Sequence, residues 1–187
     1  MTSWWAELYD DLLADVLLVR ADDADTTRTV AYLTEQLRLT PGCRVFDQCC
    51  GIGSLSVPLA QAGFEVVGVD QAAAYIERGR GDARRAGVSV ELHTGDAFDF
   101  VARPACRGVL NWWTSFGYAL DDATNARMLA RAFESLEPGG RLALDYMNVP
   151  GVLRAFAPRV VTTRDTSRGR VTLVRESRLD TARGTLH

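Results

Sequence analysis

Hydrophobic positions repeat with two different periods along the chain. Between residues 44 and 146, short runs rich in Val, Leu and Phe alternate with segments whose apolar side chains recur every three or four residues. Such alternation is typical of βαβ units that build a parallel sheet. The expected strands are Arg44–Gln48, Glu65–Val69, Ser89–Leu92, Val109–Trp112 and Arg141–Tyr146. The expected helices between them are Leu55–Ala62, Ala73–Ala86 and Ala123–Leu136, the last with Asp121 or Asp122 as its N-cap and Pro138-Gly139-Gly140 as its stop.

The segments on either side of this region have a different pattern. Before it, apolar residues at helical spacing predict two amphipathic helices, over Trp4–Val19 and Thr29–Leu37. After it, we expect a helix over Val149–Phe156 and an antiparallel hairpin from Val160–Thr163 and Arg170–Arg178, turning at Ser167-Arg168-Gly169. The fold class is therefore α/β, with two N-terminal helices and a C-terminal hairpin.

The length of 187 residues fits one hydrophobic core. We expect a single domain over 1–187, with a helical lid in 1–40, a core in 41–148 and the C-terminal helix and hairpin in 149–187. No apolar run reaches the roughly 18 to 20 residues that a membrane span requires, and the first residues lack a basic segment, so we expect a cytosolic protein.

Charge and residue usage exclude several kinds of chemistry. All 21 basic residues are Arg, which excludes a lysine Schiff base. The net charge of −3 provides no overall basic field for nucleic acid or an anionic membrane, and favours a small-molecule substrate. The four Cys form no C-x-x-C pair and only two His are present, so we expect no metal site and reduced cysteines.

A glycine loop follows the first expected strand. Its glycines, Gly51 and Gly53, allow backbone N–H groups to approach a ligand at the start of a helix. A dinucleotide fingerprint requires a glycine at position 56, where this chain has Ser56. Asp47 at the strand end would also repel a pyrophosphate by about 4 kcal/mol per charge pair. The same carboxylate suits a ligand that carries an ammonium and a sulfonium.

Two further acids follow the next two expected strands. Asp70 ends the second strand, where its oxygens suit two ribose hydroxyls. Asp96 follows the third strand, where it is placed to accept from an adenine amino group while Phe98 packs on the ring. Three acids in the same position after successive strands predict one acidic edge that binds a nucleoside.

Five sequence motifs together resemble class I S-adenosylmethionine-dependent methyltransferases, and within them a small-molecule branch. They are Phe46-Asp47-Gln48-Cys49-Cys50-Gly51-Ile52-Gly53, Val67-Gly68-Val69-Asp70, Gly95-Asp96, Asn111-Trp112-Trp113-Thr114-Ser115-Phe116-Gly117-Tyr118, and Leu136-Glu137-Pro138-Gly139-Gly140 with Asp145-Tyr146-Met147-Asn148. The resemblance implies a Rossmann-like, doubly wound sheet of order 3-2-1-4-5. It implies S-adenosylmethionine as cofactor and S-adenosylhomocysteine as product.

The resemblance also assigns residues to roles. The expected cofactor-binding residues are Tyr9, Asp47, Cys49, Gly51, Gly53, Asp70, Gln71, Asp96, Ala97, Phe98 and Asn111. The expected substrate-binding residues are Trp4, Trp5, Trp112, Trp113, Phe116, Tyr118 and Asn148. The candidates for catalysis are Asn111, Tyr118 and Tyr146, and His93 is interpreted as structural.

The chain departs from the branch in three respects. Gln48 and Ser54 stand where the branch often has an aliphatic residue and an arginine. Relatives usually continue for several tens of residues and add a final strand pair, so the hairpin is either that pair or the pair is missing. We therefore expect a homo-oligomer, or a companion chain that supplies the strands.

Three functional alternatives follow from these patterns. The first is methyl transfer to a small molecule, in the setting of natural-product biosynthesis. The second is a structural or binding subunit of a split methyltransferase, and the third is a cofactor-assisted cyclisation or rearrangement. A nicotinamide dehydrogenase is disfavoured by Asp47 and Ser56.

Overall fold

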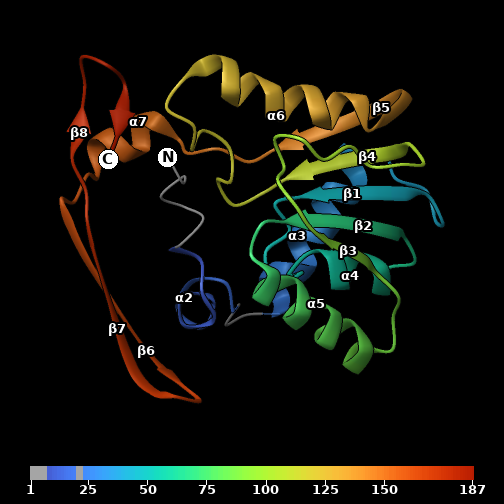
Figure 1. The fold of residues 1–187 in the computed structure, drawn as a ribbon, viewed down its shortest axis with the longest axis horizontal. Helices are drawn as coiled ribbons and strands as arrows, with labels where there is room; N and C mark the ends of the chain where they lie inside the picture. The colour runs from blue at the N-terminus through green and yellow to red at the C-terminus, as the bar shows by residue number, and fades with distance from the viewer. Residues whose placement is uncertain (1–7, 20–22) are drawn as a thin grey trace.

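A parallel sheet of five strands forms the centre of the computed structural model, which describes residues 8–19 and 23–187. The strands lie in the order β3-β2-β1-β4-β5 (Figure 1), which confirms the order that the resemblance implied. Their bounds are β1 Arg44–Gln48, β2 Glu65–Asp70, β3 Glu91–Thr94, β4 Cys106–Asn111 and β5 Leu136–Leu144.

Helices cover both faces of the sheet (Figure 1). On one face, Phe46 and Val109 pack against Met128 and Ala132 of α6, which spans Asp122–Glu134. On the other face, a second buried cluster joins strands β1, β2 and β4 to α3 and α4. The helices on that side are α3 Asp23–Gln36, α4 Ser56–Gln61 and α5 Ala73–Ala86. Burial on both faces explains why β1 and β2 read as nearly continuous apolar runs.

Local signals set most of the element ends. Helix α5 has the predicted bounds and ends at Gly87, whose φ of +70° is the left-handed conformation that glycine adopts easily. Helix α6 is capped by Asp121, whose side chain accepts from the Thr124 N–H. Strand β5 differs from the prediction, because Leu136 already pairs with Cys106 across a bulge. The Pro-Gly-Gly sequence therefore lies inside β5, and Gly139 takes up the bend with a φ of +80°.

Helix α2 spans only Asp11–Leu17, because the Asp10 side chain caps it by accepting from the Leu13 N–H at 2.8 Å. The earlier part of the predicted first helix, including Trp4 and Trp5, lies outside the described residues.

The C-terminal hairpin forms a sheet of its own. Strands β6 Arg159–Thr166 and β7 Gly169–Glu176 pair with each other, and α7 Val149–Arg154 precedes them. The short strands β8 Leu179–Asp180 and β9 Thr185–Leu186 form a second small pair. The hairpin extends away from the main sheet beyond α2 (Figure 1). It is therefore not a final strand pair of the main sheet, and within the described ranges the outer edge of β5 is unpaired.

No helix in the described part of the chain combines the length and the apolar character that crossing a membrane requires.

Candidate cofactor and acceptor site

The glycine loop turns sharply between β1 and α4. Cys49, Gly51 and Gly53 all have positive φ, of +64°, +55° and +78°. Cys49 is the unusual member, because a side chain at this φ is disfavoured. The loop brings the Gly51 N–H within 2.9 Å of the Asp70 carboxylate, so a hydrogen bond joins the loop to the end of β2.

Asp70 is placed to bind two hydroxyls. One of its oxygens accepts from the Gly51 N–H and the other from the Ala72 N–H at 3.0 Å. A backbone hydrogen bond from Gln71 also acts on this carboxylate, so three main-chain groups hold Asp70 at the end of β2. Burial raises the pKa of Asp70, while the backbone hydrogen bonds from Ala72 and Gly51 lower it.

Asp47 is placed differently from the expectation. Its side chain is only 3% exposed, and one of its oxygens accepts from the Ser56 hydroxyl at 2.6 Å. Burial raises the pKa of Asp47 to about 7, the Ser56 hydrogen bond lowers it and the nearby Asp70 charge raises it. Asp47 therefore faces α4, and acts on the crevice through its charge and through the loop that it holds. Its direct contact with a cofactor stays a prediction.

The third acid has an exposed side chain. Asp96 follows β3, and its carboxylate accepts from the Phe98 N–H at 2.8 Å. Ala97 and Phe98 are buried in the cluster beneath α6, 7% and 6% exposed, so the Phe98 ring packs in the core instead of facing an open crevice.

The three acids gather around Cys49. Burial raises the pKa of the Cys49 thiol well above its usual range, and Asp70, Asp47 and Asp96 each raise it further. These charges act over short distances in a poorly solvated site. The expected clustering at the tips of neighbouring strands is therefore present, which is the arrangement that attracts a cation.

Asn111 does not face the crevice. Its side chain is fully buried, and its Nδ2 donates to Gln48 Oε1 at 3.1 Å. Gln48 in turn donates to the Met128 carbonyl of α6 at 3.0 Å. Asn111 Oδ1 is the only buried side-chain oxygen in residues 8–19 and 23–187 without a hydrogen-bond partner. The network gives the unexpected Gln48 a structural role, and the predicted contacts of Asn111 with cofactor or acceptor gain no support from it.

The turn after β4 holds two residues in the left-handed region, Trp113 at a φ of +57° and Thr114 at +63°. A β-branched residue such as Thr rarely adopts this conformation. Asp145, just beyond β5, accepts from the Trp113 N–H at 3.0 Å and holds the turn. At the other end of the turn, Asn125 of α6 binds both the N–H and the carbonyl of Ala119. Such strain is often found at binding sites.

The aromatic residues of this turn point in different directions. Phe116 contacts Tyr146 edge to face, with ring centroids 6.0 Å apart. Trp112 and Trp113 instead pack against the core cluster on the α3 side, where the Trp112 ring lies 6.2 Å from that of Tyr32. Both tryptophans were expected to bind the substrate; this packing gives that role no support, and it stays a prediction.

A hydrogen bond joins the N-terminal segment to this turn. The Tyr9 hydroxyl donates to the Tyr118 hydroxyl at 2.8 Å, and the Tyr9 ring lies 6.2 Å from the Tyr75 ring. Burial raises the pKa of Tyr9, and the Tyr118 and Asp70 charges raise it further, so its phenol stays neutral. Tyr9 therefore lies between the cofactor edge and the acceptor turn.

The remaining predicted residues that the structure describes are exposed at the protein surface. Gln71 is exposed directly after β2, and Tyr146 is 47% exposed. Asn148 caps α7 by accepting from the Gly151 N–H at 3.3 Å. Trp4 and Trp5 cannot be assigned, because they precede the described part of the chain.

Sequence reasoning missed three residues near the site. Tyr75 and Arg78 of α5, and Ser54 of the glycine loop, all contact α2 or its ends. The spacing of Tyr75 and Arg78, one turn apart on the helix that follows Asp70, was an available signal.

Comparison with known proteins decides the family. A sequence family described as "Methyltransferase domain" matches residues 45–140, just over half of the chain. The chain belongs to this methyltransferase family. The class I members of this family use S-adenosylmethionine. The acidic edge and the glycine loop of this chain agree with that cofactor.

Curated relatives of this chain differ in what they do. The 23S rRNA (uracil(1939)-C(5))-methyltransferase RlmD of Pectobacterium carotovorum is 38% identical over 71 residues, which is 38% of this chain and 16% of that protein. The S-adenosyl-L-methionine-dependent Diels-Alderase iccD of Talaromyces variabilis is 30% identical over 123 residues, 65% of this chain and 42% of that protein. The chain thus spans less than half the length of these relatives.

Solved structures share the fold of this chain. DesVI of Streptomyces venezuelae superimposes with a TM-score of 0.70 at 21% identity, over 92% of this chain and 72% of that chain. The sugar N-methyltransferase KedS8 of a Streptoalloteichus species gives a TM-score of 0.58 at 20% identity, over 83% and 72%.

Proposed function

We propose that the chain binds S-adenosylmethionine at the glycine loop and transfers its methyl group to a small-molecule acceptor. The observation that carries the proposal is the gathering of Asp47, Asp70 and Asp96 around the loop. A phosphorylated cofactor would be repelled by these charges, whereas a sulfonium and an ammonium are attracted.

The residues present fit the nucleoside part of the cofactor. Asp70 is held by main-chain hydrogen bonds at the end of β2, where its two oxygens are proposed to accept from the ribose hydroxyls, and Asp96 is exposed for an adenine amino group. The backbone of Gly51 and Gly53, at positive φ, is the part of the loop that is proposed to lie beside the methionine part.

When bound, S-adenosylmethionine supplies a methyl group on a positively charged sulfur. A lone pair of the acceptor forms the new bond to the methyl carbon while the carbon–sulfur bond breaks, and that electron pair stays on sulfur. Because charge is lost in this step, the chain has to align the two partners and exclude water. The Tyr9–Tyr118 hydrogen bond contributes by joining the N-terminal segment to the turn beside the acceptor.

A small-molecule acceptor agrees with the charge of the chain and with the relatives. The net charge of −3 gives no basic field for RNA. The rRNA methyltransferases match over a small part of their length, so their substrate is not carried over. The name of KedS8 describes it as a sugar N-methyltransferase, and a sugar is an acceptor of the proposed size.

The direct test is calorimetric titration with S-adenosylhomocysteine for the wild type and Asp70→Ala. We expect the variant to bind about 100-fold more weakly, because it loses two charged hydrogen bonds to the ribose and the link to Gly51. Asp99→Ala is the matched control, since Asp99 is an exposed acid that pairs only loosely with Arg127 at 3.6 Å. Equal affinity of the wild type and Asp70→Ala would contradict the ribose assignment.

A second candidate is a cofactor-assisted cyclisation or rearrangement without transfer. The similarity to a Diels-Alderase favours it. Mass spectrometry of products formed from host metabolites distinguishes methyl transfer from cyclisation or rearrangement. Transfer yields S-adenosylhomocysteine and an acceptor heavier by one methyl group, whereas cyclisation leaves the cofactor unchanged.

A further inference from the structure

Helix α2 packs on the glycine loop with little apolar surface. Ala14 contacts Ile52 and Tyr75, and Ala14 and Val16 are the only residues of this helix that are buried. Leu12 and Leu17 stay 36% and 45% exposed. The apolar contribution to holding α2 therefore comes from few and small buried side chains.

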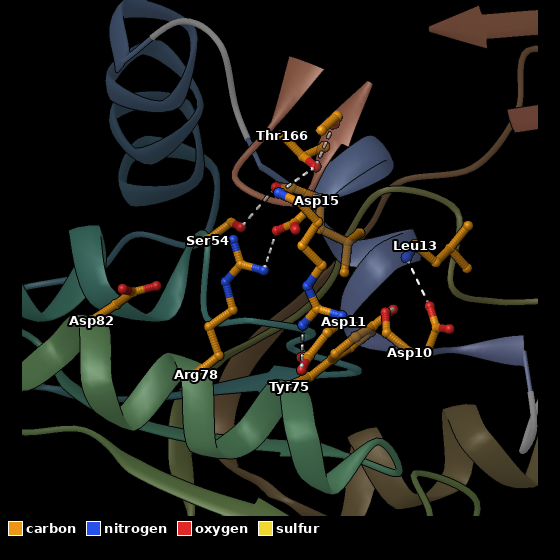
Figure 2. Close-up of polar contacts among 12 residues, drawn as sticks. Asp10, Asp11, Leu13, Asp15, Ser54, Tyr75, Arg78, Asp82 and Thr166 are labelled. Atoms are coloured by element: carbon orange, nitrogen blue, oxygen red, sulfur yellow. Dashed lines mark hydrogen bonds and ion pairs between the residues drawn. The ribbon is translucent and has the colours of Figure 1, made fainter. Parts of the chain in front are cut away.

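Polar contacts from two other elements also hold α2 (Figure 2). From α5, Arg78 pairs with Asp15 at 2.6 Å, and the Tyr75 hydroxyl donates to the Asp10 carbonyl at 2.9 Å. From the glycine loop, the Ser54 hydroxyl donates to the Leu18 carbonyl at 3.2 Å. These bonds join both ends and the middle of α2 to the elements that carry the cofactor residues.

The hairpin adds a contact from the outer side. Arg168 at its tip lies 3.4 Å from Asp11, and both side chains are more than 40% exposed. The Arg78–Asp15 pair is shorter, and its side chains are only 28% and 16% exposed. Because exposed ion pairs are weakened by solvent, the Arg78–Asp15 pair dominates.

The geometry points to Arg78 and Asp15 as positioning residues that set α2, and with it Tyr9, over the bound cofactor. This inference rests on the proposed function. Tyr9 lies two residues before α2 and close enough to Asp70 for its charge to act on the phenol. The Leu18 side chain at the other end of α2 lies against Gly51, where an added Cβ would be 3.4 Å from Leu18 Cδ1. Correct placement of α2 therefore closes the cofactor site from two sides.

The test uses the full chain, S-adenosylhomocysteine calorimetry and hydrogen exchange of residues 11–17. Arg78→Glu places a like charge beside Asp15, and we expect about tenfold weaker binding together with faster exchange in α2. The exchanged pair, Asp15→Arg with Arg78→Asp, restores opposite charges and should bind within about threefold of wild type. Arg85→Glu is the matched control on the same helix, because Arg85 is 72% exposed and pairs only with Asp82. Arg85→Glu should leave both the affinity for S-adenosylhomocysteine and the hydrogen exchange of residues 11–17 unchanged.

Several outcomes would overturn the inference. Unchanged affinity in Arg78→Glu with faster exchange in α2 would show that α2 is held by the pair but does not affect the cofactor. Failure of the exchanged pair to recover affinity would show that the ion pair is not the cause. If Arg78→Glu does not fold, Arg78→Gln and Asp15→Asn each remove one charge, and unchanged affinity in both would overturn the inference equally. Absence of binding by the wild type would instead contradict the proposed function.

Discussion

The central strand β1 and the edge strand β5 of the parallel sheet are packed to very different degrees. Strand β1 is buried from Val45 to Gln48, and the loop after it is fixed by Asp70. On the outermost strand β5, Leu142 and Leu144 are 37% and 38% exposed, and the backbone edge is unpaired within the described ranges. Exposed apolar edges of this kind are usually covered in proteins. The strand that leads into the glycine loop is thus fixed by packing, while the edge at β5 is open, and the expected homo-oligomer or companion chain stays a prediction.

Matched leucine truncations measure this difference directly. Leu59→Ala removes a fully buried side chain between α4 and the sheet, and should lower the free energy of unfolding by about 3 kcal/mol. Leu142→Ala on β5 should lower it by about 1 kcal/mol or less, because this side chain is partly solvated already. Urea unfolding followed by circular dichroism provides both values. Equal losses at the two positions would mean that β5 is covered in solution.

Asp47 gives the cofactor side a distinctive pH dependence. Its pKa rises from 3.8 to about 7 on folding, mainly through burial, so the folded chain holds this proton more tightly than the unfolded chain. The stabilisation is fully present below pH 4 and is lost as the pH rises through 7. Between pH 4.5 and pH 8 the expected decline is on the order of 3 kcal/mol.

Asp47→Asn should remove this decline, because the amide keeps an acceptor for Ser56 but does not titrate. Urea unfolding of both proteins at pH 4.5 and pH 8 tests the expectation. A wild-type decline that persists unchanged in the variant would assign it to other groups.

On the acceptor side, Asp145→Ala removes the acceptor for the Trp113 N–H and should lower the free energy of unfolding by about 1 kcal/mol. Affinity for S-adenosylhomocysteine should stay within twofold, because the glycine loop and Asp70 are untouched. Asp145→Asn keeps an acceptor oxygen and serves as the matched control. A large loss of cofactor affinity in Asp145→Ala would show that the two sides are coupled.

Local signals in the sequence determined the elements and their approximate positions. The apolar runs predicted β1 and β2, and the helical spacing predicted α5 with its observed bounds. The rule that strands of a parallel sheet end at one edge, together with three acids after three strands, predicted the acidic edge. These features depend on residues close in the sequence, or on a general property of parallel sheets.

Only the tertiary structure decided which side chains are buried in the core and which are available to the site. Asp47, Phe98 and Asn111 were expected in the crevice, yet α4 and α6 bury all three. The contacts Tyr9–Tyr118 and Asp15–Arg78 join residues more than 60 positions apart, so no local pattern predicts them. Burial and long-range contacts depend on which elements pack together, and that is fixed by the whole chain.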